Sequence, residues 1–87
     1  METTETKENI ASNVVILAEI QKSDSEIIRI SRREYRGVHY IDTRVFFETK
    51  KDGQYRPTRK GIVVREDLFG ELTEGILQAK EHLREAV

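Results

Sequence analysis

Apolar residues in the first three quarters of the chain follow patterns that are typical of strands. Residues 14–20 carry six apolar side chains in seven. Residues 26–35 alternate between apolar and polar positions. Residues 38–49 form a third run rich in β-branched and aromatic side chains, and residues 54–65 form a fourth. Runs of this length and composition predict four β-strands.

Turn residues separate these runs. Residues 22–25 suit a turn, and Arg36-Gly37 suits a tighter one. Asp52-Gly53 supports a hairpin because both residue types adopt positive φ readily. Short turns between consecutive strands predict an antiparallel sheet. We expect alternate residues of the first strand to share one face of that sheet: Val14, Ile16, Ala18 and Ile20.

The pattern changes to helical spacing after residue 65. Glu66 and Asp67 favour the positive end of a helix that starts there. Apolar residues then recur at intervals of three and four: Leu68, Phe69, Leu72, Ile76, Ala79, Leu83 and Val87. The whole pattern predicts an α+β fold in which one C-terminal helix follows a four-stranded antiparallel sheet.

The length of 87 residues limits the chain to a single domain with a small core. Residues 1–12 lack a periodic apolar pattern and predict a disordered acidic tail, which leaves residues 13–87 as the folded domain. One helix covers only part of such a sheet, so we expect a symmetric homodimer in which the helices meet. The expected interface is the apolar stripe of the helix: Leu68, Phe69, Leu72, Ile76 and Leu83.

The net charge of −1 conceals a segregation of charge along the chain. Residues 29–65, which hold most of the predicted sheet, carry a net charge of +7, whereas residues 1–28 and residues 66–87 each carry −4. Charge concentrated on one structural unit indicates an anionic partner.

Two stretches suit a single strand of nucleic acid. The open face of the second strand presents Arg29, Arg33 and Tyr35, which offer cations to phosphates and a ring to a base. Residues 54–62 hold the only proline, at position 57, and the start of that strand gives up apolar packing and an N–H donor. We expect this stretch to contact phosphates through Arg56, Arg59, Lys60 and the N–H of Gly61.

Other classes of function receive little support. The chain has no cysteine, and its two histidines, His39 and His82, belong to different predicted elements. It has no glycine-rich phosphate loop, no nucleophile motif and no apolar run near the ~20 residues that span a membrane. We therefore expect a cytoplasmic protein that is not an enzyme and binds no metal, cofactor or membrane.

An ordered set of motifs resembles the eukaryotic transcriptional coactivator family known as positive cofactor four, together with its bacterial relatives. The resemblance covers roughly residues 18–83. The motifs are Tyr35-Arg36-Gly37, Ile41-Asp42-x-Arg44, Phe46-Phe47, Asp52-Gly53 and Arg56-Pro57-x-Arg59-Lys60-Gly61-Ile62. The most specific of them is the run from Arg56 to Ile62, which arrives at the expected distance after the Asp-x-Arg strand.

The resemblance implies a curved sheet that dimerises through its helices and binds single-stranded or unpaired DNA with little sequence preference. It also implies roles in DNA binding for a further set of residues: Lys22, Tyr35, Arg36, Arg44, Phe47, Arg56, Arg59 and Lys60. A bacterial relative would work at the nucleoid. Phe47 and Arg44 have opposite parity in their strand, so either a bulge intervenes and both serve one groove, or the Phe47 ring lines a different side.

Two other partners use the same basic sheet. RNA offers the same phosphates and bases, and an acidic protein offers the same negative charge. The residues alone leave both alternatives open.

Overall fold

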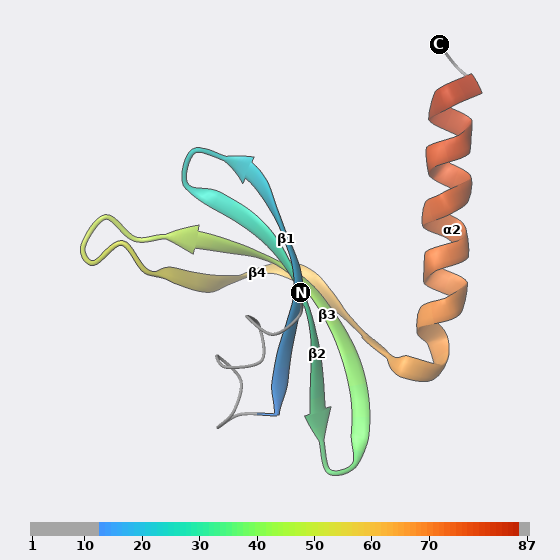
Figure 1. The fold of residues 1–87 in the computed structure, drawn as a ribbon, viewed down its shortest axis with the longest axis horizontal. Coiled ribbons are helices and arrows are strands. Elements are labelled where there is room, and N and C mark those ends of the chain that lie inside the picture. The colour runs from blue at the N-terminus through green and yellow to red at the C-terminus, as the bar shows by residue number, and fades with distance from the viewer. Residues whose placement is uncertain (1–12, 86–87) are drawn as a thin grey trace.

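The computed structural model describes residues 13–85 as one open sheet and one helix (Figure 1). Four antiparallel strands lie in chain order, so each pairs with the next. The fold class predicted from the sequence is confirmed. The elements are β1 (Val14–Ser23), β2 (Glu26–Tyr35), β3 (Val38–Glu48), β4 (Tyr55–Arg65) and α2 (Glu66–Glu85). The predicted tail, residues 1–12, lies outside the described residues, as does Val87.

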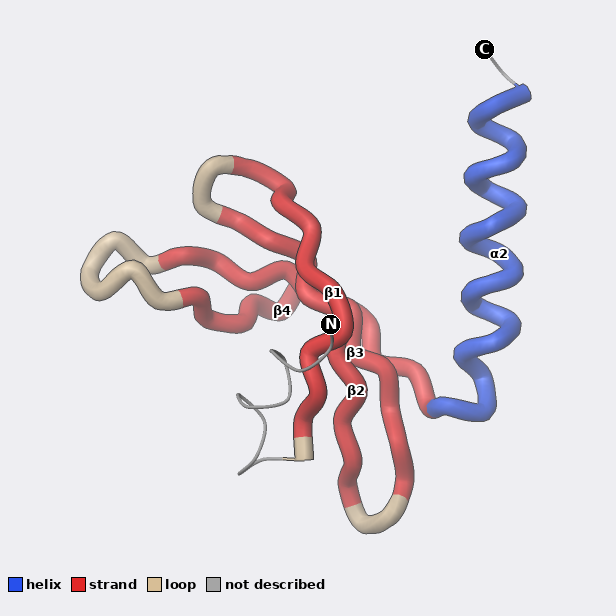
Figure 2. Tube along the Cα trace, in the orientation of Figure 1, coloured by secondary structure: helices blue, strands red, loops and turns tan. Residues whose placement is uncertain are grey.

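The strands overlap in the middle of the sheet and their ends splay apart, as Figure 2 shows. The β1–β2 and β3–β4 turns lie toward one end of the sheet, and the β2–β3 turn lies at the other. Arg36 and Gly37 form the β2–β3 turn with φ of 53° and 79°. Two consecutive positive φ values suit a tight hairpin because they match the right-handed twist of the flanking strands.

The first strand differs from its prediction in two ways. It continues to Ser23, so Lys22 lies in a strand rather than in the turn. A register shift between Ile16 and Ala18 also changes the face to which the strand points its side chains. Ile16 pairs with Ser31, whereas Ala18 pairs with Ile30. The expectation that Val14, Ile16, Ala18 and Ile20 share one face was therefore wrong, because an extra residue reverses the alternation.

The register divides the sheet into an apolar face and a polar face. The apolar face holds alternate residues of all four strands: Val15, Ala18, Ile20, Ile28, Ile30, Ile41, Val45, Phe47, Ile62 and Val64. The polar face holds their neighbours in β2 and β3: Arg29, Ser31, Arg33, Tyr35, Tyr40, Asp42, Arg44 and Phe46. Both faces contribute to a small core, which comprises Ile16, Ile27, Ile41 and Val45.

The fourth strand contains an irregularity opposite Val45. Arg44 pairs with Gly61 and Phe46 pairs with Pro57, so residues 58–60 face a single residue of β3. We call residues 58–60 the β4 bulge. Pro57 is tolerated beside it because β4 is an edge strand of the sheet.

Gly61 has a packing role that the sequence did not reveal. A Cβ atom at this position would lie 2.7 Å from the Thr43 carbonyl oxygen and 2.9 Å from Arg44 Cα. These neighbours are backbone atoms of β3, which cannot rotate away. The sequence predicts a phosphate contact at the Gly61 N–H, and the close approach of two strands explains why this position has no side chain.

Replacing Gly61 with alanine is expected to lower the free energy of unfolding by about 1–3 kcal/mol, because β3 and β4 must move apart. Urea denaturation followed by circular dichroism measures the change. Gly70→Ala is the matched control, since a Cβ there meets nothing within 4 Å. The control should leave stability unchanged or raise it by up to about 1 kcal/mol, because alanine favours helix. Equal effects at both glycines would contradict the packing argument.

Helix α2 begins directly after β4 and extends away from the sheet (Figure 1). None of its residues is buried. Of its apolar stripe, Leu68, Ile76 and Leu83 are 51%, 57% and 67% exposed. Such a stripe is typical of a helix that packs against something, and residues 13–85 of one chain leave most of it uncovered.

Candidate nucleic-acid interface

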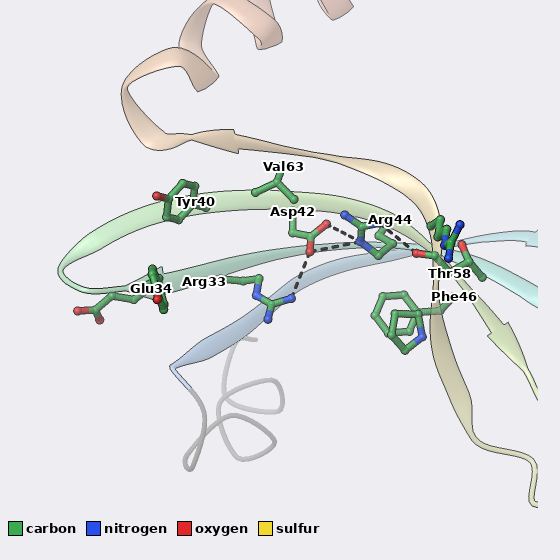
Figure 3. Close-up of a pocket in the computed structure, with 11 residues that line it drawn as sticks. Arg33, Glu34, Tyr40, Asp42, Arg44, Phe46, Thr58 and Val63 are labelled. Atoms are coloured by element: carbon green, nitrogen blue, oxygen red, sulfur yellow. Dashed lines mark hydrogen bonds and ion pairs between the residues drawn. The ribbon is translucent and has the colours of Figure 1, made fainter.

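A groove of about 740 Å³ runs along the polar face (Figure 3). Strands β2 and β3 form its floor, and the β4 bulge forms one wall. Its lining combines three aromatic rings with three arginines: Tyr35, Tyr40, Phe46, Arg33, Arg44 and Arg59. Glu34, Asp42, Pro57, Thr58 and Val63 complete the lining.

A buried carboxylate organises the charges of the groove. Asp42 is 5% exposed. Arg44 donates from Nε to Asp42 Oδ1 over 3.1 Å, and Arg33 donates from Nη1 to Oδ2 over 3.3 Å. Two guanidinium groups share one carboxylate, so the cluster retains a net positive charge. Arg33 is more than half exposed and can meet a further anion, whereas the Arg44 side chain is only 19% exposed.

Phe46 lies against a cation that is itself held in place. The Arg29 guanidinium carbon lies 4.2 Å from the centre of the Phe46 ring. Arg29 also donates from Nε to Glu19 Oε2 over 2.7 Å. The attraction between a guanidinium and a ring face keeps the two side chains together. One side of the Phe46 ring is thus occupied by Arg29, while the ring also lines the groove.

Tyr35 lies at the end of the groove beside the β2–β3 turn. Its side chain is among the most exposed of the large apolar ones, at 62%. The Arg36 guanidinium carbon lies 5.1 Å from its ring centre. An exposed ring with a cation beside it can stack on a base and attract the adjoining phosphate.

Comparison with known proteins identifies the family. Residues 22–75, more than half of the chain, match the family described as Transcriptional Coactivator p15 (PC4). The chain belongs to the PC4 family. The resemblance inferred from its motifs is thereby confirmed.

A transcriptional coactivator of yeast is similar to the chain. The chain is 36% identical over 56 residues to the RNA polymerase II transcriptional coactivator SUB1 of Saccharomyces cerevisiae. That match covers 64% of this chain and 19% of the yeast protein, so the chain spans about a fifth of that relative.

Solved structures of a PC4 homologue from Burkholderia pseudomallei share the fold. The tetragonal crystal form has a TM-score of 0.70 and 40% identity, over 77% of this chain and 97% of the homologue. The orthorhombic form has a TM-score of 0.68 and 42% identity, over 75% of this chain and 86% of the homologue.

The structure brings several of the predicted site residues together. Arg33, Tyr35, Arg44 and Arg59 all line the groove. Arg29 lies against the ring of Phe46, which lines the groove. Arg36 lies beside the ring of Tyr35 at the end of the groove.

Other predicted residues lie elsewhere. No register shift separates Arg44 from Phe47 along β2, so Phe47 points to the apolar face, opposite the groove. Of the two alternatives, the one in which the Phe47 ring lines a different side from Arg44 therefore holds within a single chain. Phe47 instead lines a separate hollow with Lys50 near the β3–β4 turn. Lys60 and Gly61 are exposed on β4 but do not line the groove.

Lys22 lies near the β1–β2 turn and is paired. Its ammonium lies 3.3 Å from Glu26 Oε1. The pKa of the Glu26 carboxyl is lowered by the hydrogen bond from the Ser23 hydroxyl and then by Lys22. Lys22 does not line the groove.

Arg56 is paired in the same manner near the β3–β4 turn. Its Nη2 lies 2.6 Å from Asp52 Oδ2. The pKa of Asp52 is lowered first by the Thr49 hydroxyl, then by the N–H of Gln54, and further by Arg56. The cross-strand partner of Arg56 is Phe47, which places both on the apolar face.

Seven groove residues were missing from the predicted site: Glu34, Tyr40, Asp42, Phe46, Pro57, Thr58 and Val63. Three of them could have been found from the alternation of the strand. Tyr40, Asp42 and Phe46 occupy the same alternate positions of β3 as Arg44, so all four side chains share one face. The family pattern instead drew attention to Phe47, one residue away. Thr58 had no signal in the sequence, since its role depends on the bulge.

Two further properties concern the described part of the chain. No helix within residues 13–85 is long and apolar enough to cross a membrane. Within the same range, no three His, Asp or Glu side chains converge as a metal site would require.

Proposed function

We propose that this protein binds single-stranded or unpaired DNA in the groove of its polar face, as a homodimer that acts in transcription. The observation that carries the proposal is the joint presence of stacking rings and cations in one groove. Tyr35, Tyr40 and Phe46 offer π faces, while Arg33 and Arg59 offer positive charge. A single strand exposes its bases and phosphates together, which is the chemistry that such a groove matches.

Stacking favours a single strand over a duplex. Bases in a duplex are already stacked and paired, so the rings of the groove gain nothing from them. Each base that stacks on an aromatic ring contributes about 1–3 kcal/mol and tolerates any sequence. We therefore propose that binding has little sequence preference, with phosphates held by Arg33 and Arg59 in the groove and by the exposed Lys60 beside it on the β4 bulge.

The uncovered helix supports the homodimer. Its apolar stripe is exposed in one chain, and a second copy supplies a matching stripe around a twofold axis. The exposed residues Ile20 and Ile62 add further apolar surface on the sheet. In the dimer, Phe47 and Arg56 would extend the binding surface beyond the groove of one chain.

Membership of a coactivator family favours transcription over replication or repair, and binding over catalysis. We propose that the protein works in the cytoplasm, at the nucleoid if its host is bacterial. RNA and an acidic protein are the competing partners.

The decisive test is a titration of fluorescent oligonucleotides followed by anisotropy at several salt concentrations. Single-stranded oligo-dT should bind more tightly than a duplex of equal length. The mass of the complex should show that it contains two protein chains. An RNA oligonucleotide that binds more tightly than DNA would redirect the proposal to RNA. Failure of excess oligo-dT to displace an acidic protein partner would favour the protein-interaction role. No binding at low salt would overturn the proposal.

Removing Arg59 and Lys60 together is expected to flatten the dependence of log K on log salt. Each phosphate contact to a single strand contributes a slope of about −0.7, so two lost contacts should reduce the slope by about 1.4. Lys80→Ala/Arg84→Ala is the matched control, because it removes the same charge from the exposed end of α2. An unchanged slope in the Arg59/Lys60 variant would exclude these residues from phosphate binding.

A further inference from the structure

The β4 bulge is closed by the side chain of a single residue, Thr58. The Thr58 hydroxyl donates to the Val45 carbonyl oxygen over 2.8 Å and accepts from the Lys60 N–H over 3.1 Å. The first bond ties the bulge to β3, and the second spans the bulge itself. The strand pairing itself gives residues 58–60 only one facing residue in β3, Val45.

The Thr58 carbonyl is held from the floor of the groove, by a side chain of β3. Arg44 donates from Nη1 to this oxygen over 3.0 Å. The same guanidinium is fixed by the buried carboxylate of Asp42, as the dashed lines in Figure 3 show. Thr58 is thus held at both its side chain and its main chain, and its own side chain is half-buried.

The residue that follows Thr58 is the groove cation Arg59. Its guanidinium stands at the end of a long, flexible side chain, and its direction depends on the backbone of the bulge. A bulge of three residues that is free to move must become ordered when a ligand binds, and this ordering opposes binding. A bulge that is already ordered avoids that loss.

We propose that Thr58 is a positioning residue that fixes Arg59 in the groove before nucleic acid arrives. It acts through Arg59 and does not itself touch the ligand. This inference rests on the proposed function, because it assigns Arg59 to a phosphate of the bound strand. It also gives Arg44 a second task, since the contact of Arg44 with Thr58 supports the bulge.

Thr58→Val removes the hydroxyl and keeps the shape of the side chain. We expect it to weaken binding of oligo-dT by about three- to ten-fold, the range that corresponds to ordering one long side chain. Thr58→Ser keeps the hydroxyl and should restore wild-type affinity. Amide hydrogen exchange at Lys60 should become faster in Thr58→Val without any ligand, because its N–H loses its acceptor.

A double-mutant cycle separates positioning from direct contact. If Thr58 acts through Arg59, Thr58→Val should have no further effect on affinity in an Arg59→Ala background. If the hydroxyl itself contacts the strand, or if the variant weakens the fold as a whole, the two effects should add. Additive effects, or wild-type affinity in Thr58→Val, would overturn the inference.

The measurements also distinguish this inference from the proposed function. Absence of oligo-dT binding by the wild-type protein refutes the proposed function and the inference together. Normal wild-type binding with additive effects refutes the inference alone. Thr58→Ala provides a second variant without the hydroxyl if Thr58→Val does not fold, as judged by circular dichroism.

Discussion

Replacement of Asp42 with asparagine is expected to lower the free energy of unfolding by about 2–4 kcal/mol. The substitution keeps the shape of the side chain and removes its charge. Arg33 and Arg44 then face a neutral amide. The amide oxygen can accept from one arginine, but the amide NH2 group is a donor, as is the guanidinium group that it faces. Arg44 cannot regain its lost partner from water, because its side chain is only 19% exposed.

The loss should extend beyond stability. Arg44 donates a hydrogen bond to the Thr58 carbonyl and pairs with Asp42. A displaced Arg44 therefore also loses its contact with the β4 bulge. We therefore expect Asp42→Asn to bind single strands more weakly, even at temperatures where it is fully folded. Urea denaturation and anisotropy titration measure the two effects separately.

Asp67→Asn is the matched control for Asp42→Asn. It makes the same chemical change in an ion pair with Arg65, whose atoms lie 2.8 Å apart but whose side chains are 61% and 57% exposed. Water can replace the partner at such a site, and exposed pairs contribute little. The control should therefore have nearly wild-type stability. An equally small effect at Asp42 would show that the central ion pair is dispensable.

Ile76→Glu is expected to convert the proposed homodimer into monomers. In the dimer, a carboxylate at position 76 would be removed from water in both subunits, at a cost of several kcal/mol per ion. Dimer dissociation should become easier by a factor on the order of 1,000 or more. Sedimentation velocity over a range of protein concentrations measures this change.

The adjacent residue provides a matched control. Leu77 is 55% exposed, almost the same as Ile76 at 57%, but it lies off the apolar stripe of α2. Leu77→Glu should therefore leave the dimer intact. If Ile76→Glu also remains dimeric, the stripe is not the interface. If the wild-type protein is monomeric at every concentration, the proposed homodimer is wrong.

Alternation and spacing were sufficient to predict the elements of this fold. The β2–β3 hairpin follows from the regular pattern of its strands and from a turn whose glycine adopts positive φ readily. Helix α2 follows from the recurrence of apolar residues at intervals of three and four. These features depend on residues that are close in the chain, so their physical causes are visible in the sequence.

The positions of Phe46 and Phe47 could not be settled in the same way. Successive side chains of a strand point to opposite faces of a sheet, so the two neighbouring rings lie on different faces. A shift of one residue in the pairing would exchange them. The family pattern pointed to Phe47, whereas the groove holds Phe46. Alternation along β3 favours Phe46, and the unbroken register of β3 against β2 decides that this alternation holds.

Local sequence determined which segments become strands, where they turn, and that the positive charge of the chain belongs to the sheet. The tertiary structure decided which side chains meet. The bulge in β1 reverses the faces of its later residues, and the β4 bulge creates the place of Thr58 beside Arg44. A bulge is a mismatch in length between two paired strands, so neither strand encodes it alone. The groove, and the cations and rings that it gathers, exist only once the strands have paired.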